Sequence, residues 1–179
     1  MKYQFEYKLT EQDYLNFNEF HFFNSPANKA GIYFWRWSIF WIFIVLSVLL
    51  ASTSRFVFSG ISLGVSLVYV FGLNRYYKWR IRSGILHGKK YEKLPYPENA
   101  LLQFGEDAII EVTPGIEMKI KYTALTKIAT NCSTSRDCIY IYHNATQAFL
   151  IPFSVFEGEQ QRTKFLEFIN SKIPQGATL

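Results

Sequence analysis

Residues 37–51 read WSIFWIFIVLSVLLA and residues 56–73 read FVFSGISLGVSLVYVFGL, and neither stretch contains a charged side chain. Extending the first stretch back to Ile32 takes in Arg36 and gives it the length of a membrane span. The hydrocarbon core of a bilayer is about 30 Å thick and needs roughly 20 apolar helical residues. The segment between the stretches, Ser52–Arg55, has room only for a tight turn. The sequence therefore predicts a transmembrane helical hairpin over residues 32–73.

Positive charge is concentrated outside this hairpin, in a chain of formal net charge +5. Lys29 and Arg36 precede or begin the first span, and the turn carries only Arg55. More cations follow the second span, opposed there only by Glu92: Arg75, Lys78, Arg80, Arg82, Lys89, Lys90 and Lys93. Because basic residues beside membrane spans mark the cytoplasmic side, we expect a multi-pass protein of the cytoplasmic (inner) membrane with both termini in the cytosol.

The basic segment 74–93 is expected to continue as a juxtamembrane helix until Pro95 and Pro97 end it. Its cations can bind anionic phospholipid headgroups, at about 1 kcal/mol each near the surface. They can equally serve to set the topology, and the two roles are compatible. Since the positive charge is gathered beside the spans and not spread over a soluble domain, nucleic acid is not an expected partner.

Within the second span, Gly60 and Gly64 form a pair of small residues one helical turn apart. Small residues allow helix backbones to approach closely in lipid. We expect the pair to pack inside the hairpin against Ser47 and Ala51, in preference to forming a homodimer. Neither charge-free stretch contains the ionisable residues that usually mark ion or proton paths, so a channel or transporter is not favoured.

The segment before the hairpin, residues 1–31, is predicted to contain a strand and a helix. Tyr3–Leu9 alternates apolar and polar side chains, as a half-buried strand does. An amphipathic helix over Glu11–Phe23 begins after Thr10, which stands three residues before Asp13 as in a capping box. The many aromatic residues of this helix suit either the membrane interface or a contact with the protein's own soluble domain, and the sequence leaves both open.

Residues 94–179 are predicted to form a cytosolic β-domain with a C-terminal helix. Gly105-Glu106-Asp107 and Thr113-Pro114-Gly115 are turn signals between short strands. The predicted strands cover 100–104, 108–113, 116–122, 125–131, 138–142 and 148–151. In the clearest of them, Ile116, Met118 and Ile120 share one face. A helix over 157–172 has its apolar residues at helical spacing and would cover the sheet.

Several stretches carry a family resemblance: FGEDAII at 104–110, IKYTAL at 120–125, IYIY at 139–142, AFLIPFSVF at 148–156 and LTEQDYLNF at 9–17. In these stretches, and in the order of its C-terminal elements, the chain resembles the YcxB-like family of small bacterial membrane proteins. The resemblance implies a pleckstrin-homology-like (PH-like) barrel of seven strands closed by a C-terminal helix. It supplies no catalytic residues.

Only six strands are found after the hairpin, so Tyr3–Leu9 is the candidate for the seventh. Left alone, this strand would expose an apolar face and a row of free backbone groups. We therefore predict an α+β membrane protein in which the hairpin is inserted after the first strand of a small antiparallel PH-like barrel.

No catalytic or metal-binding pattern stands out. His21, His87 and His143 are far apart in sequence and have no metal-ligand spacing to other side chains. Cys132 and Cys138 flank a short loop and are expected to stay reduced in the cytosol. We therefore expect a non-enzymatic protein without a cofactor.

Two functions remain open. The first is a membrane-anchored binding module that presents its β-domain to a protein, a peptide or a lipid headgroup. The second is an immunity, protective or structural partner protein that acts through the transmembrane hairpin itself, with a homodimer possible through that hairpin.

Overall fold

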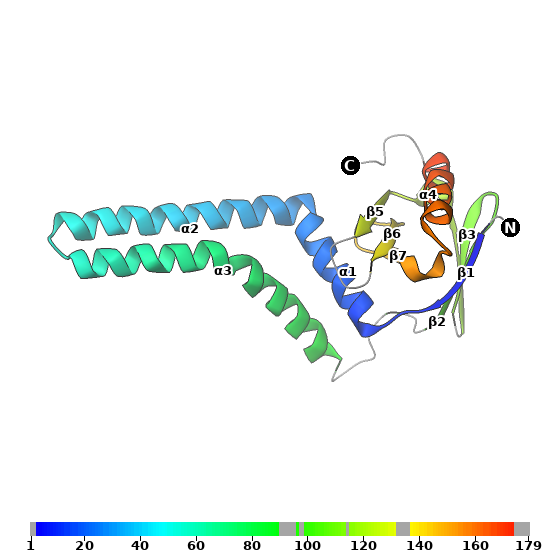
Figure 1. Ribbon diagram of the computed structural model, residues 1–179, viewed down its shortest axis with the longest axis horizontal. Coiled ribbons are helices and arrows are strands. Elements are labelled where there is room, and N and C mark those ends of the chain that lie inside the picture. Colours follow the sequence, from blue (N-terminus) through cyan, green and yellow to red (C-terminus); the bar gives the residue numbers. More distant parts are fainter. Residues whose placement is uncertain (1–2, 90–95, 97–98, 114, 132–136, 174–179) are drawn as a thin grey trace. The chain divides into compact units, whose positions relative to one another are not determined.

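The computed structural model describes residues 3–89, 96, 99–113, 115–131 and 137–173. The chain is a mixed α+β protein of two compact units: Met1–Phe17 with Pro95–Leu179 (unit 1), and Asn18–Leu94 (unit 2). The helices, labelled in Figure 1, are α1 (Glu11–Asn24), α2 (Pro26–Ser52), α3 (Phe56–Gly88) and α4 (Glu159–Lys172). The strands are β1 (Tyr3–Lys8), β2 (Asn99–Phe104), β3 (Ala108–Thr113), β4 (Ile116–Lys121), β5 (Lys127–Asn131), β6 (Cys138–Tyr142) and β7 (Ala148–Pro152).

The first strand, β1, pairs with β2 although the whole of unit 2 separates the two in sequence. They run antiparallel, with Phe5 opposite Leu102 and Tyr7 opposite Ala100. The order β1-β2-β3-β4 makes one four-stranded sheet, and β5-β6-β7 makes a three-stranded one. The prediction that Tyr3–Leu9 joins the sheet of the C-terminal domain is thus confirmed.

The two sheets do not close into the barrel that we expected. The predicted strands 116–122 and 125–131 are each shorter in the structure, because Tyr122–Ala124 forms a single 3₁₀ turn between β4 and β5. The Tyr122 hydroxyl donates to the Gly105 carbonyl at 3.0 Å, and the Tyr122 amide donates to the Asp107 carbonyl at 3.1 Å. The amide bond extends the β3–β4 pairing by one residue, and after the 3₁₀ turn the chain enters β5, which belongs to the three-stranded sheet.

The core of unit 1 combines residues from both ends of the chain. The ring of Phe5 on β1 meets three other rings, with centroids 5.0–5.8 Å apart. They belong to Phe104 on β2, Phe156 just after the 3₁₀ turn Phe153–Val155, and Phe165 on α4. Phe165 and Ile169, one turn apart on α4, are fully buried. As predicted, α4 covers the sheet with its apolar face.

Helix α1 begins with the predicted capping box and then divides between the two units. The Thr10 amide donates to Asp13 Oδ2 at 2.9 Å, and the Asp13 amide donates to Thr10 Oγ1 at 3.3 Å. In its first half, Phe17 packs on Tyr140 of β6 with ring centroids 5.2 Å apart. Of the two placements left open by the sequence, the first half of α1 therefore takes the one against the β-domain, within unit 1.

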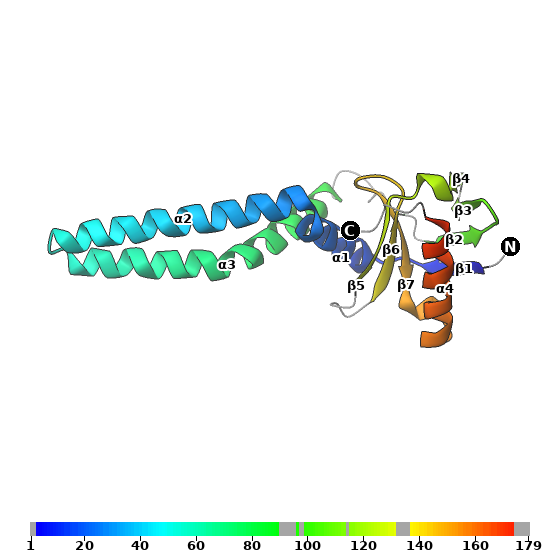
Figure 2. The ribbon, with the colours of Figure 1, turned by 90° about the horizontal axis from the view of Figure 1, so that it is seen from above.

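Unit 2 contains the predicted hairpin, and Figures 1 and 2 show α2 and α3 side by side along it. Both helices extend beyond the apolar stretches: α2 begins at Pro26, and α3 continues to Gly88. The turn between them has Ser54 in the left-handed region, at φ 61°. The Ser54 amide donates to the Ala51 carbonyl and the Arg55 amide to that of Leu50, the pattern of a Schellman C-cap.

Candidate functional site

The apolar side chains of α2 and α3 are largely exposed. Of the most apolar 18-residue stretch of each helix, 6% is buried in α2 and 17% in α3. Both helices are long and apolar enough to cross a membrane. The core helix of a water-soluble domain would bury most of such a stretch, whereas a span turns it toward lipid. Contiguous exposed apolar surface of this extent marks an interaction site for membrane or protein.

A row of serines, not the pair of glycines, lies between the two helices. Ser47 Oγ on α2 is 2.7 Å from Ser59 Oγ on α3, and Ser62 Oγ donates to the Phe43 carbonyl at 3.0 Å. Ser66, one turn further along α3, is fully buried. Small hydroxyl side chains allow close approach and supply the interhelical hydrogen bonds that hold helices together in lipid.

Gly60 and Gly64 do not take the place inside the hairpin that the sequence suggested. Both are exposed, and a Cβ added at either would meet nothing within 4 Å. The reason is rotational: the serines occupy the side of α3 that faces α2, at the spacing of 59, 62 and 66, and the two glycines fall outside that stripe. Their small side is open to contacts from outside the hairpin.

The basic extension of α3 is helical, as predicted, up to Gly88. Arg75, Lys78, Arg80 and Lys89 are exposed, while Arg82 is half-buried. Lys90 and Lys93 lie outside the described residues. In Figure 1 the later part of α3 runs obliquely to its first part, so the basic extension leaves the direction of the hairpin.

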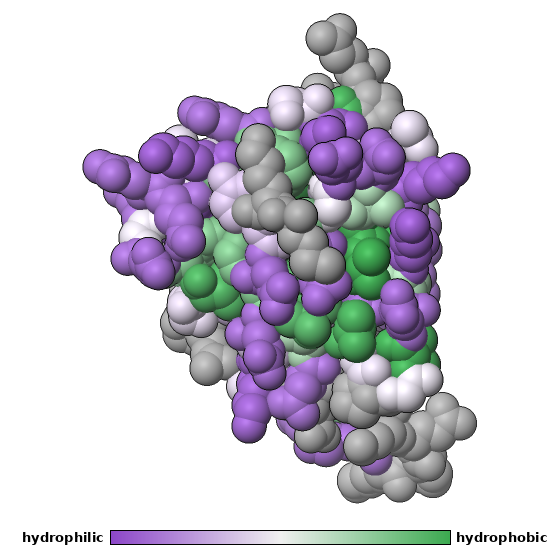
Figure 3. All heavy atoms as spheres, turned by 90° about the vertical axis from the view of Figure 1, so that its right-hand side faces the viewer, coloured by the Kyte–Doolittle hydropathy of each residue, from purple (hydrophilic) through white to green (hydrophobic). Residues whose placement is uncertain are grey.

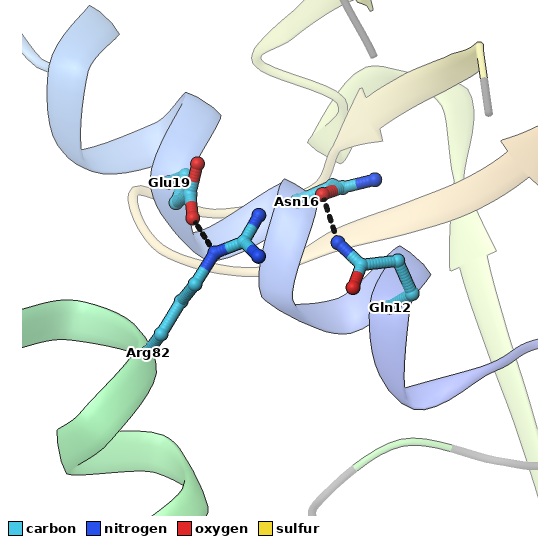
Figure 4. A network of polar contacts seen from close by, with 4 residues as sticks. All are labelled: Gln12, Asn16, Glu19 and Arg82. Carbon is cyan, nitrogen blue, oxygen red and sulfur yellow. Dashed lines mark hydrogen bonds and ion pairs between the residues drawn. The ribbon is translucent and has the colours of Figure 1, made fainter. Parts of the chain in front are cut away.

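Arg82 differs from the other cations because it is held by an internal carboxylate. Its Nε atom forms an ion pair with Glu19 Oε1 on α1 (Figure 4). The Glu19 side chain is only 10% exposed, whereas 43% of the Arg82 side chain remains accessible. In the same part of unit 2, the rings of Phe22 and Tyr77 pack with centroids 5.4 Å apart. The two contacts join α1 to the basic extension of α3.

A surface hollow of about 350 Å³ lies on the exposed side of this extension. It is lined by Trp79, Arg82, Ser83, Leu86 and His87. These positions recur at three- and four-residue spacing, which places them on one face of the helix. Trp79 is 64% exposed, and Leu86 is 39% exposed. Sequence reasoning had grouped Arg82 with its basic neighbours and had missed the face that combines it with apolar and hydroxyl groups.

The edge of the four-stranded sheet is a second surface that the sequence did not reveal. Within the described residues, β4 pairs only with β3. Ile116, on the face expected to be buried, is 69% exposed, and Met118 and Ile120 are half-buried. Figure 3 looks onto an end of unit 1 and shows hydrophobic side chains gathered between hydrophilic ones. Half-buried Leu101, Ile110 and Val112 contribute apolar surface to the opposite face of the same sheet.

Titratable groups inside unit 1 are shifted by burial. Desolvation raises the pKa of Tyr7 well above its ordinary value, and the nearby Glu111 and Cys138 raise it further. Desolvation also raises the pKa of Glu111, which shares the inner face of the sheet with Phe5 and Leu102. Burial lowers the pKa of His143, whose ring lies 5.1 Å from that of Phe149.

These groups do not form a recognisable catalytic or metal centre. Among the residues that the structure describes, no three His, Cys, Asp or Glu side chains are placed to hold a metal ion. His21 and His87 belong to unit 2, and His143 to unit 1. Cys138 is fully buried in β6, and Cys132 lies outside the described residues.

The family model described as YcxB-like protein matches residues 104–169, which run from the end of β2 into α4. The resemblance to the YcxB-like family is therefore shown over this part of unit 1. No curated protein and no solved structure matches the chain.

Proposed function

We propose that the chain is a membrane-anchored, non-enzymatic binding module of the bacterial cytoplasmic membrane. In this proposal α2 and α3 cross the bilayer as a hairpin, and unit 1 is a PH-like domain held at the cytosolic face. The YcxB-like match over residues 104–169, the sheets of four and three strands and the C-terminal helix support the PH-like assignment.

The observation that carries the proposal is the pairing of β1 with β2. β1 precedes both apolar helices and β2 follows both, yet the two strands exchange backbone hydrogen bonds in one sheet. Strands of one sheet must lie on the same side of any membrane. An anchor between them must therefore cross an even number of times, which a hairpin of two spans does. The cations beside the hairpin, Lys29, Arg36 and the basic extension of α3, indicate the cytosol as that side.

The binding surface in this proposal is the open edge of β4, with an extended acidic segment of a partner protein as its ligand. An unpaired edge offers backbone donors and acceptors to an added strand. Lys119 and Lys121 alternate along one face of β4, and exposed Ile116 lies on the other. Lysines along an edge oppose its pairing with a second identical edge, while they attract an acidic strand.

Reporter fusions test the topology directly. An alkaline-phosphatase fusion at Leu179 is expected to be inactive and a fluorescent-protein fusion there to be bright, because both report a cytosolic end. A phosphatase inserted at Thr53 is expected to be active outside the cytosol. The matched pair of positions controls for expression, and an active phosphatase at Leu179 would refute the proposed arrangement.

A second candidate function is favoured by one observation, the open side of Gly60 and Gly64. In this alternative the hairpin is itself the active part and receives a helix of another membrane protein. The helix is either that of a toxin, which the protein would neutralise, or that of a larger complex, which it would support.

A further inference from the structure

We propose that the hollow between Trp79 and His87 on α3 is a binding site for the headgroup of an anionic phospholipid, with Arg82 as the phosphate ligand. This inference rests on the proposed membrane anchoring of α2 and α3. It goes beyond a general attraction of basic residues to the membrane, because it assigns one side chain and one face of the helix.

The chemistry of the lining fits an amphiphilic ligand. Arg82 offers a planar array of donors that matches a phosphate, and Ser83 contributes a hydroxyl to the lining of the same hollow. Trp79 and Leu86 contribute apolar surface to the lining of the same hollow. A phospholipid presents a charged phosphate directly beside apolar chain, so one molecule satisfies both kinds of side chain.

The position along α3 also fits the interface. Leu73 is the last residue of the apolar stretch, and at 1.5 Å per residue Trp79 follows it by about 9 Å and Arg82 by about 14 Å. The headgroup layer extends roughly 5–8 Å beyond the hydrocarbon core on each side. The oblique course of the later part of α3 (Figure 1) makes the rise in depth smaller than these lengths along the helix. Tryptophan is also favoured at this level of a bilayer.

Glu19 acts as a positioning residue for Arg82. The ion pair uses Nε of the guanidinium, and Figure 4 shows the two terminal nitrogens directed away from Glu19. Glu19 thus holds the side chain by one nitrogen and leaves the others for a ligand. Arg80 provides the matched comparison, because it is an exposed cation on the same helix and does not line the hollow.

The test uses the full chain in lipid nanodiscs, with Trp35, Trp37 and Trp41 replaced by Phe so that Trp79 is the fluorescent reporter. Phosphatidylglycerol and phosphatidylcholine, each brominated near the top of the acyl chain, are compared as quenchers. We expect phosphatidylglycerol to quench Trp79 more strongly. Arg82→Gln should reduce this preference by about tenfold, against roughly fivefold at most for Arg80→Gln, the effect of one cation near an anionic surface.

Two further variants separate a site from diffuse attraction. Ser83→Leu fills the hollow without changing the charge and should abolish the preference for phosphatidylglycerol. This variant keeps the ion pair between Arg82 and Glu19, so it tests the hollow independently of Arg82→Gln. Glu19→Ala makes the protein more positive, yet it should weaken the preference because Arg82 loses its support. Equal losses from Arg80→Gln and Arg82→Gln, a full preference in Ser83→Leu, or a gain in Glu19→Ala would each overturn the site. Displacement of the lipid by inorganic phosphate would overturn a lipid as its occupant.

Failure of this inference is distinguishable from failure of the anchoring. A protein that resists extraction from membranes by alkaline carbonate, but shows no lipid preference at Trp79, retains its anchor and loses only the headgroup site. A protein that carbonate releases loses both.

Discussion

The ring of Phe5, in the strand before the apolar helices, meets the ring of Phe165, in the last helix, edge to face with centroids 5.1 Å apart and planes at 87°. Edge-to-face pairs of this kind contribute about 0.5–1.5 kcal/mol beyond the area that they bury. The core of unit 1 is therefore completed by a residue from the opposite end of the chain.

Removing the Phe5 ring should destabilise unit 1 strongly. Phe5→Ala leaves a cavity against Phe104, Phe156 and Phe165, and such truncations typically cost about 3–5 kcal/mol. The measurement is denaturant unfolding of the full chain in detergent, followed by a probe in unit 1. Phe58→Ala, at an exposed position of α3, is the control and should change the stability of unit 1 little.

Because the core of unit 1 needs Phe5, residues 94–179 expressed alone should fold poorly and should be rescued by a peptide of residues 1–23. A cooperatively melting 94–179 fragment would contradict the shared core.

The serine contact predicts a specific crosslink inside the hairpin. Ser47 and Ser59 have their Oγ atoms 2.7 Å apart, so cysteines at both positions should form a disulfide on mild oxidation in membranes. The double variant is made without the two native cysteines. The pair Ser47→Cys and Gly60→Cys is the control and should remain reduced, because Gly60 faces outward. Equal crosslinking of both pairs would show that the helices meet on a different face.

The stability of unit 1 should depend on pH through Glu111. The folded state holds the pKa of this carboxyl above its ordinary value of 4.5 because burial disfavours the charged form. The folded chain therefore keeps the proton longer than the unfolded chain, and stability falls as the pH rises from 4.5 through the raised pKa. Glu111→Gln should raise the unfolding midpoint at neutral pH and lose this advantage below pH 4.5.

The control for this measurement is Glu117→Gln, which removes an exposed carboxylate from the neighbouring strand β4 and should change the unfolding midpoint at neutral pH little. A Glu111→Gln variant that is less stable than the parent at neutral pH would mean that the ionised carboxylate makes a favourable contact.

The open edge of β4 predicts a position-specific contact with a partner. A photoreactive residue at Ile116 should give a discrete adduct in intact membranes, because this side chain is exposed at the edge. The same group at Lys164, exposed on α4, is the control. Replacing Lys119 and Lys121 by Glu should abolish the adduct if the partner segment is acidic. Adducts of equal strength at both positions would remove β4 from the candidates.

The outward side of the glycines predicts where a helix partner would bind. Gly60→Leu together with Gly64→Leu should leave the hairpin intact, since an added Cβ meets nothing within 4 Å at either position. If a second copy or another protein packs there, the leucines should eliminate its crosslink to α3. Loss of the Ser47–Ser59 disulfide in this variant would instead assign the glycines to the hairpin itself.

Local patterns were sufficient for the elements of the fold. The apolar runs predicted the hairpin, and the alternation in Tyr3–Leu9 predicted a strand. The pairing of this strand with the C-terminal domain was predicted from the seven strands that the family resemblance implies, of which only six were found after the hairpin. The open arrangement of the sheets was not predictable in this way. The first sheet ends at the single 3₁₀ turn over Tyr122–Ala124, after which β5 belongs to the second sheet, and one turn of this kind leaves no periodic signal.

The candidate site shows the same limit. The net charge of the basic extension could be read from the sequence, but the separate environment of Arg82 could not. That environment requires Glu19, which comes before the first apolar run, to meet a residue that comes after the second. The rotation of α3 was missed for a related reason. Serines and glycines are both small, and only the packing of α3 on α2 decides which of them lie between the helices.

The position of β1 has a consequence for biosynthesis. In the proposed topology, this strand leaves the ribosome before its partner β2 and stays on its side of the membrane until both apolar helices have been made. A chain that inserted its first apolar helix but failed to return through the second would leave β2 to β7 across the bilayer from β1. Unit 1 would then lack its edge strand and the Phe5 ring, and would expose β2 to proteolysis and aggregation. In the proposed topology, the complete sheet therefore forms only in a molecule whose two apolar helices have both crossed the bilayer.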